Sequence, residues 1–184
     1  MFLFAAAFLL NHSREYHLAV LFSIVEFFLE LYFVPGWKLH PLVRPVGIAL
    51  VIIGQFFRVS AMSTAASNFS HRIEYFKRKE HELVTHGVYR FIRHPSYLGW
   101  FWWIVGSQIL LGNPLCAVGY SFVAWGFFHD RIPYVSKLVQ GFILCRFLML
   151  TAVCYRYEEQ LLLGFFPDEY PAYKARTISG IPFV

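Results

Sequence analysis

Long apolar runs separated by short polar segments dominate the chain. The runs cover residues 1–10, 18–34, 46–57, 97–111, 115–128 and 138–155. A helix needs about 20 mostly apolar residues to cross the roughly 30 Å hydrocarbon layer of a bilayer, and several of these runs reach or approach that length. The pattern therefore predicts an all-α, polytopic integral membrane protein with about five to six apolar helices in one domain, residues 1–184.

Helix-breaking residues mark the connections between the runs. Pro35-Gly36 and His40-Pro41 interrupt the pattern after the second run, and only Gly112-Asn113-Pro114 separates two later ones. So short a break predicts a tight hairpin of two helices. After the last run, residues 158–166 form an amphipathic stretch, and residues 167–184 form a polar tail rich in turn residues and Tyr.

Composition and charge support a membrane protein with a cytosolic basic loop. The chain is 58% hydrophobic and 20% aromatic, which is outside the usual range of soluble domains. Its net charge of +5 is concentrated in one loop between apolar runs. In membrane proteins a short basic loop marks the cytosolic face and contacts anionic headgroups, so it predicts lipid rather than nucleic acid as partner. We therefore place residues 68–93 in the cytosol.

Charged residues are rare inside or directly beside the apolar runs, and Glu26, Glu30 and Arg58 are candidates for a site there. Glu26 and Glu30 are one helical turn apart, and we expect them to be structural, paired with the region of Lys38 or Arg44. For Arg58, structural pairing and function both remain open.

Polar side chains are also dense where residues 81–99 enter an apolar run. An interfacial belt explains Trp100 and its neighbours, but it explains His94-Pro95 less well. The adjacent acids Glu158 and Glu159 fit either the dipole at a helix start or a site. The histidines of this region lack the ligand spacing of a zinc site, so we expect no metal.

One set of motifs resembles a known enzyme family. Arg93-His94-Pro95-Ser96-Tyr97-Leu98-Gly99 with the downstream Glu158-Glu159 is similar to the isoprenylcysteine carboxyl methyltransferase family. The similarity also includes residues 9–13, 68–71, 81–89, 165–166, 169–170, 173–174 and 180–183, so it extends over most of the chain. The wider superfamily, which includes phospholipid N-methyltransferases, resembles only the Arg-His-Pro and Glu-Glu portions.

The resemblance implies a site for S-adenosylmethionine as cofactor. Carboxylates and aromatic faces suit its sulfonium cation, and His and backbone donors suit its amino-acid end. The cofactor residues it implies are Glu74, His81, Glu82, Leu83, Val84, Tyr89, His94, Pro95, Ser96, Tyr97 and Glu158. Arg131 matches the family's substrate-binding arginine and Arg58 another arginine near the reaction centre, so both are expected to be catalytic by meeting the substrate carboxylate.

The function implied is methyl esterification of the C-terminal prenylcysteine carboxylate of CaaX-type proteins, the reaction of a protein-S-isoprenylcysteine O-methyltransferase. The expected location is the endoplasmic reticulum membrane, with several membrane crossings, an active site facing the cytosol, and prenylated proteins and membrane lipid as partners. One alternative is a phospholipid N-methyltransferase, although an amine acceptor needs no arginine like Arg131. The other is an inactive, truncated membrane isoform.

Two departures from the family pattern bear on activity. Relatives usually carry further membrane helices ahead of the motif at residues 9–13. This chain begins close to that motif, so it is expected to be truncated at the amino end. Arg131 precedes Glu158 by 27 residues, whereas the family's arginine stands four residues before the cofactor glutamate. Removing residues 135–157 would restore that spacing, so we interpret them as an insertion. If residues 138–155 crossed the bilayer, Arg131 and Glu158 would face opposite compartments.

Overall fold

A computed structural model describes residues 14–70, 75–77, 79–131 and 158–181 of the chain. This part is built of the helices α1 (Arg14–Phe33), α2 (Pro35–Lys38), α3 (Val43–Ala65), η3 (Ala66–Asn68), η4 (Gly87–Arg90), α4 (Pro95–Leu111), α5 (Pro114–Arg131), α7 (Glu158–Phe165) and α8 (Tyr170–Arg176). Within these residues no β-strand forms, and one isolated parallel bridge pairs Ile92 with Ile178. The predicted all-α class is confirmed for this part.

Four of the predicted apolar runs coincide with α1, α3, α4 and α5. Helix α3 continues eight residues past the predicted end, because its polar positions, among them Ser60 and Thr64, interrupt the apolar run without breaking the helix. Among the described residues, two helical segments are long and apolar enough to cross a membrane, Tyr16–Phe33 and Val43–Asn68, and Pro114–Phe128 is a shorter apolar helix. The runs 1–10 and 138–155 lie outside the described residues, so the total of five to six helices stays a prediction.

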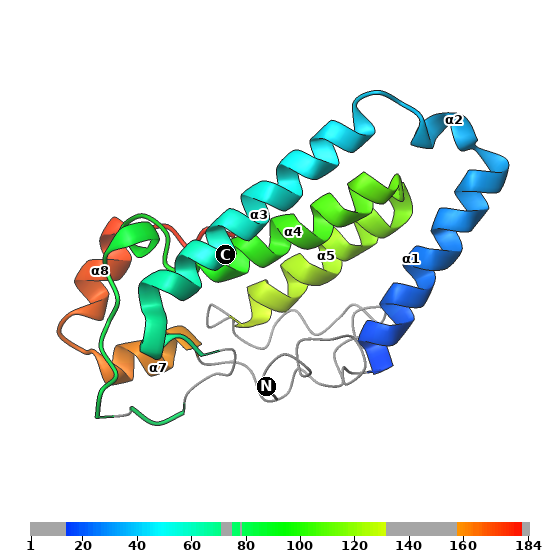
Figure 1. The fold of residues 1–184 in the computed structure, drawn as a ribbon. Helices are drawn as coiled ribbons and strands as arrows, with labels where there is room; N and C mark the ends of the chain where they lie inside the picture. The colour runs from blue at the N-terminus through cyan, green and yellow to red at the C-terminus, as the bar shows by residue number, and fades with distance from the viewer. Residues whose placement is uncertain (1–13, 71–74, 78, 132–157, 182–184) are drawn as a thin grey trace, which may run out of the picture.

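Helices α3, α4 and α5 run side by side, and α1 flanks α5 (Figure 1). The turn between α4 and α5 lies at one end of this bundle, next to α2. Helices α7 and α8 gather at the other end, beside the end of α3 and the segment that leads into α4 (Figure 1). The bundle therefore has two ends, one formed by the α4–α5 turn with α2 and the other by α7 and α8, and residues far apart in the sequence meet at each.

Glycines bring the backbones of α3 and α4 together. A Cβ atom placed on Gly54 would lie 2.5 Å from the backbone nitrogen of Trp103, and one on Gly99 would lie 2.6 Å from that of Arg58. Gly47 and Gly106 are as crowded at other points along the same antiparallel pair. Close backbone approach at small residues is a main source of helix association in membranes. The seam also fixes Arg58 beside the first turn of α4.

The predicted hairpin of α4 and α5 is confirmed. Gly112 ends α4 in the left-handed conformation, with φ of 69°, and its N–H bonds back to the carbonyl of Ile109. A left-handed C-terminal residue is usually glycine because it carries no Cβ. At the start of α5, the carboxylate of Glu26 accepts the backbone N–H groups of Leu115 at 2.6 Å and Cys116 at 2.7 Å. Glu26 thus caps α5 from α1.

The ammonium of Lys38 ties α1 to the same turn. It donates to Glu30 Oε2 at 3.3 Å, and to the carbonyl oxygens of Leu111 at 3.0 Å and Gly112 at 3.2 Å. The side chain is only 8% exposed, and such a buried cation is tolerated because oxygen acceptors surround it. The expected structural role of Glu30, with Lys38 as its partner, is confirmed.

Replacing Gly54 by Ala should destabilise the protein, because the new methyl group meets the α4 backbone, which cannot give way as a flexible side chain would. Overpacking of this kind costs about 1–3 kcal/mol. Thermal unfolding of the detergent-solubilised chain measures the loss. Gly119→Ala in α5 is the matched control, because nothing lies within 4 Å of its Cβ position. Equal melting temperatures for the two variants would contradict the close backbone packing of α3 against α4 at Gly54.

Candidate active site

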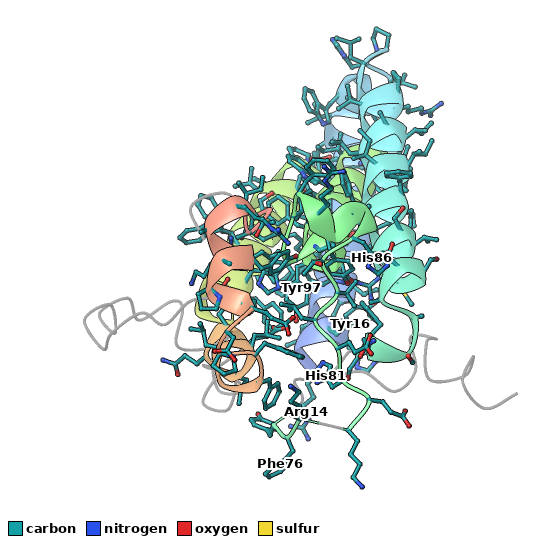
Figure 2. All side chains as sticks on the ribbon, turned by 90° about the vertical axis from the view of Figure 1, so that its left-hand side faces the viewer. Arg14, Tyr16, Phe76, His81, His86 and Tyr97 are labelled. Carbon is teal, nitrogen blue, oxygen red and sulfur yellow. The ribbon has the colours of Figure 1, made fainter. Side chains whose placement is uncertain are left out.

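A cavity of about 500 Å³ lies at the end of the bundle where α7 and α8 gather. Its walls come from the end of α3, the segment 81–97, helix α5 and the carboxy-terminal helices. Figure 2 shows Tyr97 in the middle of this end of the molecule, with α7 and α8 on one side and the segment carrying His81 and His86 on the other. The volume is within the roughly 300–1,000 Å³ of small-molecule sites.

The cavity gathers nearly all the site residues that the sequence suggested. Its lining includes Arg58, His81, Glu82, Leu83, Val84, Tyr89, His94, Pro95, Ser96, Tyr97 and Glu158. Glu74 lies outside the described residues. Arg131 is the last residue of α5, and its side chain is likewise outside the described part.

The first turn of α4 presents several of these groups together. His94 is the N-cap and Pro95 occupies the first helical turn, where its missing N–H costs nothing. The turn then carries Ser96, whose hydroxyl accepts a hydrogen bond from Arg58 Nη1 at 3.3 Å. Arg58 is therefore held at the cavity wall by a hydrogen bond from α3 to the first turn of α4.

Tyr97 is the centre of an aromatic column beside a carboxylate. Its hydroxyl donates to Glu158 Oε2 at 2.8 Å. Its ring stacks on His94 at 5.5 Å and on Phe128 at 4.9 Å, and Trp100 meets Phe128 edge-on at 5.6 Å. A carboxylate next to aromatic faces is an environment that stabilises an organic cation.

The paired acids at the start of α7 have different surroundings. Glu158 is half-buried and lines the cavity, whereas Glu159 is 5% exposed and turns away from it. Glu159 Oε1 accepts from Arg93 Nε at 3.0 Å and lies 3.6 Å from His94 Nε2, and its Oε2 pairs with Lys174. Burial by itself would raise the pKa of Glu159, but the surrounding cations outweigh burial and lower it to about 2.

The tail supplies walls that the sequence analysis did not assign to the site. Residues 167–184 were expected to be turn-rich, yet residues 170–176 form α8, and Tyr170 and Tyr173 line the cavity. The hydroxyl of Tyr173 donates to the carbonyl of Tyr89 at 2.7 Å. Burial raises the pKa of Tyr89 and that of Tyr173 to about 12 each, so both phenols are neutral at neutral pH.

Asn68, Phe69 and Ser70 line the cavity as well and were not singled out as site residues. A signal for them existed, because these positions and Tyr173 belong to the motifs that carry the family resemblance. The resemblance showed that they matter, and only the structure shows that they face the cavity.

The ends of α5 and α7 that flank residues 132–157 adjoin the same cavity. Val123, Ala124, Phe127 and Phe128 line it from α5, and Glu158 lines it from α7. Arg131 is three residues, less than one helical turn, beyond Phe128. The described chain therefore stops at the end of α5 and resumes at α7 beside the same cavity.

Comparison with known proteins identifies the family. The model of the isoprenylcysteine carboxyl methyltransferase (ICMT) family matches residues 47–140, about half of the chain. A protein-S-isoprenylcysteine O-methyltransferase B of Arabidopsis thaliana is 38% identical over 172 residues, which cover 94% of this chain and 76% of that protein. The chain belongs to the isoprenylcysteine carboxyl methyltransferase family.

Other ICMT-family proteins agree over nearly the whole chain. The protein-S-isoprenylcysteine O-methyltransferases of Tribolium castaneum and Homo sapiens are each 41% identical over 178 residues, which cover 97% of this chain and 55% of each relative. A solved structure of the eukaryotic intramembrane Ras methyltransferase ICMT superposes with a TM-score of 0.81 at 39% identity, covering 98% of this chain and 56% of that one. The chain thus spans about half the length of these relatives, and membrane embedding follows from the shared fold.

The depressed pKa of Glu159 predicts a loss of stability in acid. Its carboxylate stabilises the fold fully above the ordinary pKa of 4.5, and this contribution disappears as the pH falls through about 2. The shift corresponds to about 3 kcal/mol, more than half of it lost by about pH 3. Between pH 7 and pH 3 the melting temperature should therefore fall further for the unmodified chain than for Glu159→Gln. If the melting temperatures of the unmodified chain and of Glu159→Gln fell equally with pH, the ion pairs of Glu159 would contribute nothing to stability.

Proposed function

We propose that this chain methylates the C-terminal carboxylate of prenylcysteine in CaaX-type proteins, using S-adenosylmethionine. The observation that carries the proposal is the joining of the Tyr97–Glu158 pair and Arg58 in one cavity at the end of a membrane bundle. One part of that cavity suits a cation and another suits an anion. The names of the relatives, protein-S-isoprenylcysteine O-methyltransferase, support the same reaction.

The residues present fit S-adenosylmethionine. Glu158 offers a carboxylate beside the ring of Tyr97, which suits a sulfonium cation. His94 lines the cavity with its ring stacked on that of Tyr97, so its imidazole lies where the amino-acid end of the cofactor could be bound. When bound, the cofactor supplies an electrophilic methyl group. We assign its binding to Glu74, His81, Glu82, Leu83, Val84, Tyr89, His94, Pro95, Ser96, Tyr97 and Glu158.

The acceptor needs orientation more than it needs a base. A C-terminal carboxylate has a pKa of about 3.3–3.7 and is ionised at neutral pH, so it is already nucleophilic. Arginine binds a carboxylate through two parallel hydrogen bonds, and we assign this role to Arg131 with Arg58 beside it. The chain's remaining task is to hold that oxygen in line and keep water away. The neutral phenols of Tyr89 and Tyr173 are consistent with a site that removes no proton.

The membrane setting suits a lipid-modified substrate. Trp100 and Phe127 line the cavity with apolar surface, and Phe122 on the same helix α5 is 71% exposed, as expected beside lipid. We propose that the prenyl chain lies against this apolar wall, and that the basic segment 68–93 places the site at the cytosolic face of the endoplasmic reticulum. Prenylated proteins and membrane lipid would be its partners.

We propose further that residues 1–184 form one methyltransferase unit, in which residues 135–157 are an insertion that leaves Arg131 near Glu158. The support is that α5 and α7 line one cavity.

Membranes holding the full chain should transfer label from S-adenosylmethionine to a farnesylcysteine analogue. Radioactive methyl ester, released as methanol by base, is the measurement, with membranes lacking the chain as control. Label on phosphatidylethanolamine alone would instead indicate a lipid N-methyltransferase. Label on neither acceptor would indicate an inactive isoform.

Arg131→Gln and Glu158→Gln should impair different steps. Losing charge-assisted hydrogen bonds worth about 1.5–3 kcal/mol should raise KM for the prenylcysteine acceptor about tenfold to a hundredfold in Arg131→Gln, with cofactor affinity unchanged. Glu158→Gln should weaken cofactor binding and leave the acceptor KM unchanged. Exposed Glu80→Gln is the control. The assignment fails if both variants affect the same constant.

A further inference from the structure

Consecutive side chains on an α-helix point about 100° apart, so adjacent acids cannot face the same neighbours. At the start of α7, Glu158 faces the cavity and bonds Tyr97. Glu159 instead lies between α8 and the residues at the start of α4. Glu159 is buried and is not among the cavity-lining residues. The reaction proposed above gives it no role.

The ion pair of Glu159 with Arg93 is more buried than its ion pair with Lys174. The Arg93 side chain is 11% exposed, whereas that of Lys174 is 45% exposed, so water screens the lysine pair more. Arg93 Nη1 also donates to the carbonyl oxygens of Lys174, at 3.2 Å, and Thr177. One guanidinium therefore joins the carboxylate of α7 to the last turn of α8.

The backbone of the same segment is held from the other side. The N–H of Arg93 donates to the carbonyl of Ile178 at 2.8 Å, and that of His94 to the carbonyl of Ser179 at 3.2 Å. The start of α4 is thus fixed to the tail before it presents Ser96 and Tyr97 to the cavity. A group on α7 that binds Arg93 therefore ties α7 to a segment that the tail already holds in place.

Both carboxylates join α7 to the start of α4 and the residues just before it: Glu159 pairs with Arg93 and His94, and Glu158 bonds Tyr97. A helix held at one point can rotate about that point, and a second contact about 100° away around the axis removes the freedom. The apolar residues Leu162 and Phe165 pack α7 against Phe166, Tyr170 and Tyr173, and the two carboxylates set the orientation of its first turn. Its orientation depends on both carboxylates.

We propose that Glu159 is a positioning residue: by binding Arg93 and Lys174 it sets the rotation of α7 and so holds the Glu158 carboxylate at the cofactor wall of the cavity. The inference rests on the proposed function, since it assigns Glu158 to the cofactor. Misplacing a site group by about 1 Å can cost about a hundredfold in reaction rate. We expect a loss of cofactor affinity of about tenfold to a hundredfold when Glu159 loses its charge.

The test measures S-adenosylmethionine binding by calorimetry on the full chain in nanodiscs, together with the melting temperature and the acceptor KM. Glu159→Gln should raise the cofactor Kd at least tenfold while the acceptor KM changes less than twofold. Lys174→Met, which alters an ammonium outside the cavity, should raise Kd a few-fold. Glu159→Asp keeps the charge on a shorter side chain and should restore part of the affinity.

Two controls separate positioning from general loosening. Glu169→Gln removes an exposed carboxylate just before α8 and should leave Kd unchanged. Gly47→Ala crowds the far end of the α3–α4 seam, where a Cβ would lie 2.5 Å from Leu110 Cα, and should lower the melting temperature without changing Kd.

The inference is overturned if Glu159→Gln and Lys174→Met bind the cofactor as tightly as the unmodified chain. It is also overturned if Gly47→Ala, at an equal loss of melting temperature, weakens binding as much as Glu159→Gln. Should Glu159→Gln fail to fold, Lys174→Met decides the question, because the ammonium it removes is partly solvated. Absence of binding by the unmodified chain would refute the proposed function itself, a result distinct from both of these.

Discussion

A buried carboxylate surrounded by cations holds the candidate site together. Glu159 is removed from water, and an isolated carboxylate there would be costly, so Arg93 and Lys174 stabilise it in its buried position. These residues come from α7, from the segment before α4, and from α8. Their ion pairs therefore close the end of the bundle with contacts between parts of the chain that are distant in sequence.

The opposite end of the bundle follows the same physical rule with the charges exchanged. There the buried cation Lys38 is surrounded by Glu30 and by carbonyl oxygens of the α4–α5 turn, and Glu26 caps α5. Between the two ends, glycines let α3 and α4 approach until backbone meets backbone. Polar clusters fix both ends of the bundle, and close packing of α3 against α4 fixes its middle. Arg58, on the mostly apolar helix α3, is thereby placed within hydrogen-bond distance of Ser96 on α4.

The cavity that results combines two opposite electrostatic preferences in a small volume. Glu158 with the Tyr97 ring favours a cation, and Arg58 favours an anion. The proposed transfer of a methyl group from a sulfonium to a carboxylate would use both at once, and the names of the ICMT relatives describe an O-methyltransferase of protein isoprenylcysteine. Two of the tyrosines that wall the site, Tyr89 and Tyr173, stay neutral, so the polarity of the cavity comes from the few groups that carry charge.

The sequence by itself determined the helical class, the α4–α5 hairpin and most of the candidate residues that the structure places at the cavity. These depend on local properties, such as apolar run length, the break at Gly112 and motifs read along the chain. It could not determine that α3 continues past residue 57, that residues 170–176 form α8, or which of Glu158 and Glu159 faces the cavity. Helix rotation and the docking of the tail are decided by contacts across many residues, such as Arg93 with Glu159 and Tyr173 with Tyr89. The local sequence does not specify which distant residue will contact a given side chain, so helix rotation and tail docking were decided only by the tertiary structure.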